Sequence, residues 1–184
     1  MVTIALDRSH PWPAAYAKAT RALEIAARLG LPVVTLVDTP GADPSPASEN
    51  AGIASSIARL FETMLWVEVP VLSIVTGEGG SGGALAFAVG NRLVIYSDAI
   101  FSVIGPEAAA TILWRDAERA PEAAELQKLS AADLEELGIA DQVVDRRLDP
   151  GSLKSVISYH LARLDQSPAG GWARARRTRW RDAT

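Results

Sequence analysis

The chain has 184 residues and a net charge of −4, and hydrophobic residues make up 48% of it. This composition is typical of one folded domain and excludes a largely disordered chain. Cysteine is absent and there are only two histidines, so we exclude disulfides and cysteine nucleophiles and expect no metal site in this chain. No apolar run reaches membrane-spanning length and charge comes early at the N-terminus, so we expect a cytoplasmic protein.

Hydrophobic periodicity alternates between strand and helix along the chain. Nearly continuous apolar runs predict buried strands, and apolar residues repeated every three or four positions predict helices. The predicted strands are residues 2–7, 31–37, 69–76, 92–96, 100–104 and 142–144. The predicted helices are residues 14–29, 51–66, 84–89, 107–115, 121–128, 131–137 and 152–164. This alternation predicts an α/β protein with a mainly parallel sheet.

Two unusual loops follow consecutive predicted strands. Residues 38–46 are rich in Asp, Pro and Gly, and residues 77–83 contain five glycines. Loops after parallel strands lie at one edge of the sheet, so we expect these two to meet there, where α/β proteins bind ligands. The glycines predict either positive φ angles or a ligand against bare backbone. The next helix begins with amides that lack helical partners, so this corner would bind an anion or a developing oxyanion.

The glycine segment is open to several interpretations. Gly77-x-Gly79-x-x-Gly82 matches the dinucleotide fingerprint, although Asp98 poorly fits the acid expected about 20 residues later. The start of a P-loop is also present, but Gly83-Ala84 replaces the Lys-Ser/Thr pair that holds phosphates and magnesium, so we reject it. Ser81 fits a nucleophile elbow, but neither histidine has an evident orienting acid, and a helix N-cap suits Ser81 better. An oxyanion hole and simple tight packing are the remaining interpretations.

Charge is distributed unevenly along the chain. Residues 172–184 carry five arginines and one aspartate, which leaves 13 basic and 21 acidic residues elsewhere. The acidic remainder argues against a nucleic-acid surface there. The basic segment, with Trp172 and Trp180, could contact RNA, a phosphate or an acidic partner, but we favour a solvated chain end. We therefore predict a domain over residues 1–166 and a basic tail over residues 167–184, with a linker at residues 168–171.

Several separate segments between about residues 2 and 144 carry one family pattern in order. They are residues 16–23, 31–42 (LPVVTLVDTPGA), 77–86 (GEGGSGGALA), 101–107 (FSVIGPE), 112–124 (ILWRDAERAPEAA) and 134–141 (LEELGIAD). Together they resemble the carboxyltransferase α subunit of bacterial acetyl-CoA carboxylase, a biotin-dependent carboxyltransferase of the crotonase superfamily. The chain departs from that family at Asp43, where an aromatic residue is usual, and at Ala108-Ala109, which replace Gly-Cys. Compared with the family, we also expect an N-terminal helical extension and the first strands to be missing.

The resemblance implies a crotonase-like fold, a right-handed spiral of ββα units. It implies transfer of a carboxyl group from carboxybiotin to the α-carbon of an acyl-CoA, by default acetyl-CoA, which gives malonyl-CoA. Carboxybiotin would be carried on a separate biotin carboxyl carrier protein, and a β-type carboxyltransferase subunit would supply mainly the CoA side. We therefore expect a hetero-oligomer whose catalysis uses backbone amides and no side-chain base.

The resemblance also assigns the site to three stretches of backbone. In chain order these are Gly79 and Gly80 for backbone clearance, Gly82, Gly83 and Ala84 as oxyanion donors, and Gly105, Pro106 and Glu107 as a neighbouring helix start that lines the site. Glu107 equally fits a role in stabilising the positive end of its helix. Two alternatives remain: a non-catalytic assembly subunit, and a stand-alone crotonase-type CoA enzyme that would use Glu78 or Glu107 as its acid or base.

Overall fold

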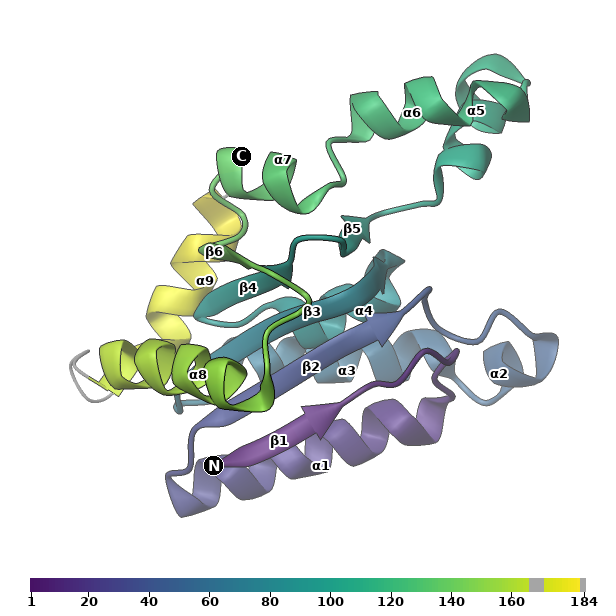
Figure 1. Cartoon of the computed structure of the whole chain (residues 1–184). Helices are drawn as coiled ribbons and strands as arrows, with labels where there is room; N and C mark the ends of the chain where they lie inside the picture. The colour runs from purple at the N-terminus through teal and green to yellow at the C-terminus, as the bar shows by residue number, and fades with distance from the viewer. Residues whose placement is uncertain (166–170, 183–184) are drawn as a thin grey trace.

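The fold is built on one sheet, seen in a computed structural model that describes residues 1–165 and 171–182 (Figure 1). The strands of this part of the chain are β1 (Val2–Ala5), β2 (Val33–Thr39), β3 (Val71–Gly80), β4 (Arg92–Tyr96), β5 (Ile100–Ser102) and β6 (Gln142–Val144). Their order is β1-β2-β3-β4-β6, and β5 pairs with the last residues of β3. All of these pairs are parallel, which confirms the predicted α/β class.

Helices cover both faces of the sheet (Figure 1). In the described ranges they are α1 (Pro13–Leu29), α2 (Pro46–Asn50), α3 (Ile53–Trp66), α4 (Ser81–Ala88), α5 (Pro106–Trp114), the 3-10 turn η1 (Ala117–Arg119), α6 (Ala120–Gln127), α7 (Ala131–Glu136), α8 (Pro150–Asp165) and α9 (Trp172–Asp182). The larger core lies between the sheet and α1, α3 and α4, and the smaller core lies under α8. Along β3, Val71 and Val75 face the first core while Leu72 and Ile74 face the second, so both faces of the strand are apolar.

Local signals set several helix ends as predicted. Gly30 follows α1 with φ 61°, a left-handed conformation that glycine adopts without strain. Pro106 occupies the first position of α5, with Glu107 beside it in the first turn. The short α2 was not predicted; Pro46 begins it, and the Ser45 side chain accepts a hydrogen bond from the Ser48 amide at 3.2 Å.

The basic C-terminal segment is not a solvated chain end, so that expectation is wrong. Residues 172–182 form α9, which packs against α3 and buries Arg176 completely. The Arg176 guanidinium donates hydrogen bonds to the carbonyls of Met64, Val67 and Val69, at and just beyond the end of α3. The reason is electrostatic: the last carbonyls of a helix lack partners and carry partial negative charge, which a cation offsets. The boundary predicted after residue 166, and most of the predicted linker, lie outside the described residues.

The two tryptophans of this segment also face the protein. The indole of Trp172 donates to the Leu164 carbonyl at 3.2 Å, and that of Trp180 donates to the Gly90 carbonyl at 2.8 Å. Asn91 ties the segment further, because its amide group donates to the Trp172 carbonyl at 2.9 Å. These indoles therefore serve to dock α9, rather than to stack on an RNA base.

Helices α5 and α6, with η1 between them, form an arm that extends away from the sheet (Figure 1). The arm has a small core of its own, built from Ala109, Ala110 and Ala123. Its outer surface keeps large apolar side chains exposed, among them Ile112 and Leu126. The arm is therefore a self-packed unit with unpartnered apolar surface.

Candidate functional site

The glycine segment forms a strand, a tight turn and a helix. Residues 77–80, expected as a loop, continue β3, and Gly79 pairs with both Thr39 of β2 and Phe101 of β5. None of the glycines in residues 77–83 has a positive φ; instead Ser81 does, at 58°. Of the two explanations for these glycines, positive φ angles are therefore excluded. The expectation of Ser81 as N-cap is wrong, because the helix starts at Ser81 with Gly80 as its cap.

Close approach by the protein itself explains several of these glycines. A Cβ at Gly79 would collide with the Phe101 ring, and one at Gly80 would collide with the Pro40 carbonyl. A Cβ at Gly83 would lie 2.6 Å from the Ala42 amide nitrogen, closer than real Cβ atoms come. The tight-packing interpretation is thus confirmed for these three positions. The contacts with residues 40–42 also confirm that the two unusual loops meet at one edge of the sheet.

Buried hydrogen bonds hold α4 at both ends. At its start, the Tyr16 hydroxyl donates to the Gly83 carbonyl at 3.4 Å. At its end, the Phe87 carbonyl accepts from the hydroxyls of Thr35 at 2.7 Å and Ser73 at 3.1 Å. Because these groups belong to α1, β2 and β3, the helix is fixed against the sheet and its first turn has a set position.

Tyr16 links the first turn of α4 to the pH dependence of stability. Burial raises the pKa of the Tyr16 hydroxyl to about 12. The unfolded chain then loses this proton near pH 10 while the folded chain keeps it, so the free energy of unfolding should fall as pH rises from about 10 to 12. Urea titrations of the wild type and Tyr16→Phe across this range test the prediction. The fall should be smaller in the variant, and equal slopes would contradict it.

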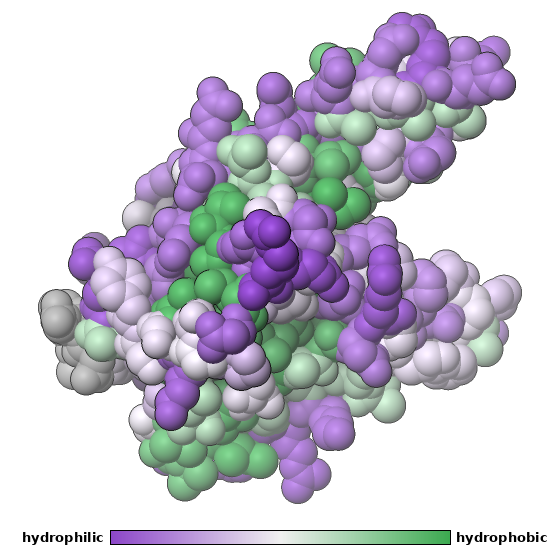
Figure 2. Space-filling view, viewed as in Figure 1, coloured by the Kyte–Doolittle hydropathy of each residue, from purple (hydrophilic) through white to green (hydrophobic). Residues whose placement is uncertain are grey.

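A cavity of about 510 Å³ opens beside the first turn of α4. Its walls are mainly apolar and come from α4, β5, the end of α6, α7, α9 and adjoining loops. The lining residues are Ser81, Gly82, Leu85, Phe101, Ser102, Val103, Gln127, Lys128, Leu134, Leu137, Ile139 and Trp180. Figure 2 shows apolar side chains gathered below the arm and above the body of the molecule. Among the described residues, neither Glu78 nor Glu107, the two acid–base candidates, lines this cavity.

Gly82 is the one predicted oxyanion donor that lines the cavity. It is exposed, and a Cβ there would meet nothing within 4 Å. Gly83 and Ala84 are buried directly behind it. Gly82 and Gly83 are the second and third residues of α4, where a helix offers their amides no backbone acceptor. Gly82 therefore combines an amide that lacks a helical acceptor with open space beside the residue.

The other predicted site residues lie farther from this cavity. Gly79 and Gly80 are buried in the strand behind the turn, and none of Gly105, Pro106 and Glu107 is among the lining residues. Gly105 and Glu107 are exposed at the start of α5, on the arm. A substrate-binding role for these five residues stays a prediction.

Sequence reasoning missed most of the cavity wall. Leu134, Leu137 and Ile139 lie in a segment that carried the family pattern, but no property of that segment placed it beside the glycine turn. Trp180 was assigned to a solvated tail, yet it forms part of the wall. The only local signal was its large apolar side chain within a strongly basic run.

The interpretation of Ser81 as a nucleophile finds no support in the geometry. His10 lies against the Gly41 carbonyl at 3.1 Å, and His160 is bonded to Gln142 at 2.8 Å. No hydrogen bond from Ser81 to either imidazole occurs within the part of the chain that is described, so a serine nucleophile has no base. In the same residues there is no cluster of His, Asp or Glu able to hold a metal ion. None of the described helices has both the length and the apolar character of a membrane span.

Comparison with known proteins places this chain in a family. The family model described as acetyl co-enzyme A carboxylase carboxyltransferase-like matches residues 4–182, nearly the whole chain. The chain belongs to this family. The match extends beyond the resemblance seen in the sequence, since it includes the helix α9 that completes the cavity wall.

Named relatives of the carboxyltransferase-like chain agree with this membership. It is 52% identical over 141 residues to the acetyl-coenzyme A carboxylase carboxyl transferase subunit alpha of Sinorhizobium medicae (strain WSM419), covering 77% of this chain and 44% of the relative. It is 45% identical over 178 residues to the subunits beta/alpha protein of Salinispora tropica (strain ATCC BAA-916 / DSM 44818 / JCM 13857 / NBRC 105044 / CNB-440), covering 92% of this chain and 31% of the relative. The chain thus spans less than half the length of these relatives.

A solved structure confirms the expected crotonase-like fold. The carboxyltransferase-like chain superposes on transcarboxylase 12S, a structure with methylmalonyl-coenzyme A and methylmalonic acid bound, with a TM-score of 0.81. The superposition covers 90% of this chain and 34% of that chain, at 23% identity. At this identity the likeness establishes the fold.

Proposed function

We propose that the chain is the α-type component of a biotin-dependent acyl-CoA carboxyltransferase. The observation that carries this proposal is Gly82, an uncovered residue in the first turn of α4 that opens into an apolar cavity of about 510 Å³. The reaction would move a carboxyl group from carboxybiotin to the α-carbon of an acyl-CoA, with acetyl-CoA as the expected substrate and malonyl-CoA as the product. The named relatives support this assignment.

The residues present suit a biotin ureido group or a thioester carbonyl. Both are neutral, planar groups whose oxygen gains negative charge as the reaction proceeds. In both, apolar parts of the same molecule adjoin the reacting group and could pack against the apolar cavity wall. Carboxybiotin, on its carrier protein, would supply the carboxyl group. The amides of Gly82 and Gly83, with Ala84 behind them, would donate hydrogen bonds to the charged oxygen, with the positive end of α4 adding to the effect. Such donors are already in position, so the reaction requires no reorganisation of solvent around the charge.

Exposed apolar surface supports a β-type partner. Val103, at the cavity rim, is 84% exposed, and Ile112 and Leu126 on the arm are 72% and 67% exposed. Large apolar side chains left exposed in this way commonly mark a protein interface. A β-type subunit seated on the arm would close the cavity from that side and bring acyl-CoA to it. We expect the active site to lie at this subunit interface.

Reconstitution tests the proposal. The 184-residue chain is mixed with a β-type carboxyltransferase subunit, a biotinylated carrier protein that has been carboxylated, and acetyl-CoA, and malonyl-CoA is measured. Formation of malonyl-CoA that requires both subunits is the expected result. A stable complex that forms no carboxylated product from acetyl-, propionyl- or butyryl-CoA would point to a non-catalytic assembly subunit. Turnover of acyl-CoA by the isolated chain would point to a stand-alone enzyme.

A further inference from the structure

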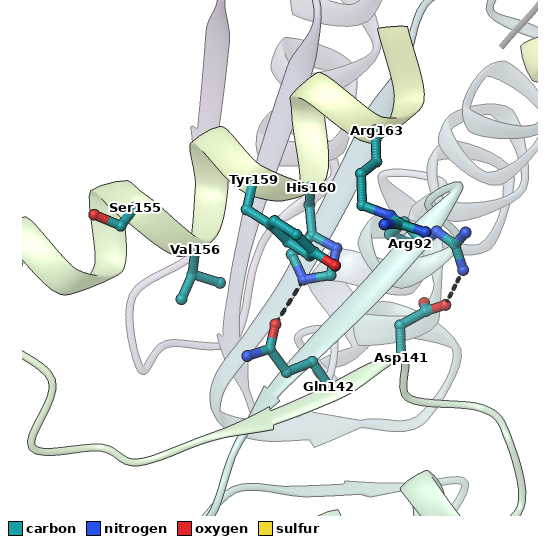
Figure 3. A pocket seen from close by; sticks show the side chains of 8 residues that line it. All are labelled: Arg92, Asp141, Gln142, Ser155, Val156, Tyr159, His160 and Arg163. Carbon is teal, nitrogen blue, oxygen red and sulfur yellow. Dashed lines mark hydrogen bonds and ion pairs between the residues drawn. The ribbon is translucent and has the colours of Figure 1, made fainter. Parts of the chain in front are cut away.

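A second hollow, of about 590 Å³, lies between α8 and the first residues of β4 and β6 (Figure 3). From α8 it is lined by Ser155, Val156, Tyr159, His160 and Arg163, and from the strands by Arg92, Asp141 and Gln142. Because all strand pairs are parallel, this hollow lies at the amino ends of the strands, whereas the glycine turn follows the carboxyl end of β3. The carboxyl-transfer chemistry proposed above makes no use of it.

Positive charge predominates in this hollow. Its one carboxylate, Asp141, is only 10% exposed and is already bonded to Arg92, to Arg179 at 2.9 Å and to the Leu93 amide at 2.7 Å. Figure 3 shows Arg163 reaching from α8 toward the end of the hollow where Arg92 and Asp141 lie. Each guanidinium has five N–H donors in a planar fork, more than Asp141 can accept from Arg92.

Neutral donors complete the lining. His160 contacts the Gln142 side-chain oxygen at 2.8 Å, and because that oxygen can only accept, the imidazole donates and the Gln142 NH2 group stays available. Burial lowers the pKa of His160, so this imidazole is neutral at pH 7 and acts to orient Gln142. The Tyr159 hydroxyl is a further donor, and the Arg163 guanidinium lies over the Tyr159 ring at 5.5 Å.

We propose that this hollow binds a phosphoryl group, either as free phosphate or as the end of a nucleotide. Arg92 and Arg163 would bind its oxygens, and the Gln142 amide and the Tyr159 hydroxyl would add neutral hydrogen bonds. Paired guanidinium groups match the geometry of phosphate, which accepts several hydrogen bonds at once. The volume is within the range of small-ligand sites, and Val156 and Tyr159 provide apolar wall for a larger ligand.

Calorimetric titration of the 184-residue chain tests this site. Inorganic phosphate and ADP are titrated in separate experiments, with chloride used to keep the ionic strength constant. Arg163→Gln should weaken binding about tenfold, the loss typical of one charge-assisted hydrogen bond. Arg174→Gln removes the same charge from an exposed position on α9 outside the hollow and should leave binding unchanged. Tighter binding of ADP would identify a nucleotide as the ligand, and equal binding would identify phosphate itself.

Two results would overturn the proposal of a phosphoryl site. Absence of binding heat with both probes in the wild type would do so, and so would equal weakening by Arg163→Gln and Arg174→Gln, which would mean non-specific attraction to positive charge. Tyr159→Phe provides a second variant that keeps the charge, and it should weaken binding by a smaller factor. Thermal unfolding of each variant confirms that it is folded. Because the site lies away from the glycine turn, Arg163→Gln should retain malonyl-CoA formation, which keeps this test separate from that of the proposed function.

Discussion

Replacing Gly82 with leucine should reduce carboxyl transfer by the reconstituted enzyme by at least about 100-fold, the typical loss for one oxyanion donor. A Cβ at Gly82 meets no atom within 4 Å, and the residue is helical, so the larger side chain should not strain the fold. Leucine would instead occupy the cavity in front of the amide donors and exclude the substrate oxygen. The measurements are malonyl-CoA formation, thermal unfolding and size-exclusion chromatography of the complex.

Two other substitutions to leucine serve as controls for Gly82→Leu. Ala17→Leu places the same side chain at an exposed position of α1 and should change neither rate nor stability. Gly83→Leu should unfold the protein, since its Cβ would lie 2.6 Å from the Ala42 nitrogen and 2.8 Å from the Tyr16 hydroxyl. Full activity of Gly82→Leu would show that the start of α4 does not hold the reacting oxygen, and the proposed function would lose the observation that carries it.

Arg176→Met should lower the free energy of unfolding by about 3–5 kcal/mol, because several buried carbonyls would lose their donor and each such group costs about 1–3 kcal/mol. The guanidinium is completely buried and also donates to the Asn91 side-chain oxygen at 2.7 Å. Burial lowers the Arg176 pKa to about 10, which still leaves the side chain charged at pH 7. Urea unfolding followed by far-ultraviolet circular dichroism measures the effect.

The matched control is Arg174→Met, which removes an exposed guanidinium from the same helix. Its effect should stay within about 0.5 kcal/mol, as is usual for exposed positions. Trp180, also on α9, lines the cavity beside Gly82, so loosening of α9 in Arg176→Met should reduce carboxyl transfer as well. A loss of stability below about 1 kcal/mol would contradict the role of Arg176 in docking α9, since even one buried acceptor left without a donor costs that much.

Much of the fold follows from local pattern. Apolar runs and helical spacing predicted the strands and most of the helices of the described residues, because burial on one or two faces leaves a periodicity in the sequence. Segment ends were predictable where one residue determines them, as Gly30 and Pro106 do. The glycine turn was recognisable as the candidate site, but its glycines were expected in a loop and lie partly in β3. A run of glycines has the same composition in a strand as in a loop, so composition could not predict that these residues continue the strand.

The sequence by itself determined the α/β class, the meeting of two loops at one edge of a parallel sheet, and, through the order of several motifs, the carboxyltransferase-like family. Only the tertiary structure decided which glycine faces a cavity. Gly82 and Gly83 are chemically identical, but Tyr16 and Ala42 pack against Gly83 while the space beside Gly82 is open. The tertiary structure also decided that the arginine-rich end is a docked helix, because Arg176 finds its acceptors more than 100 positions away, at Met64, Val67 and Val69. Spacing along the chain records which faces are buried, whereas contacts between distant segments depend on how the elements pack.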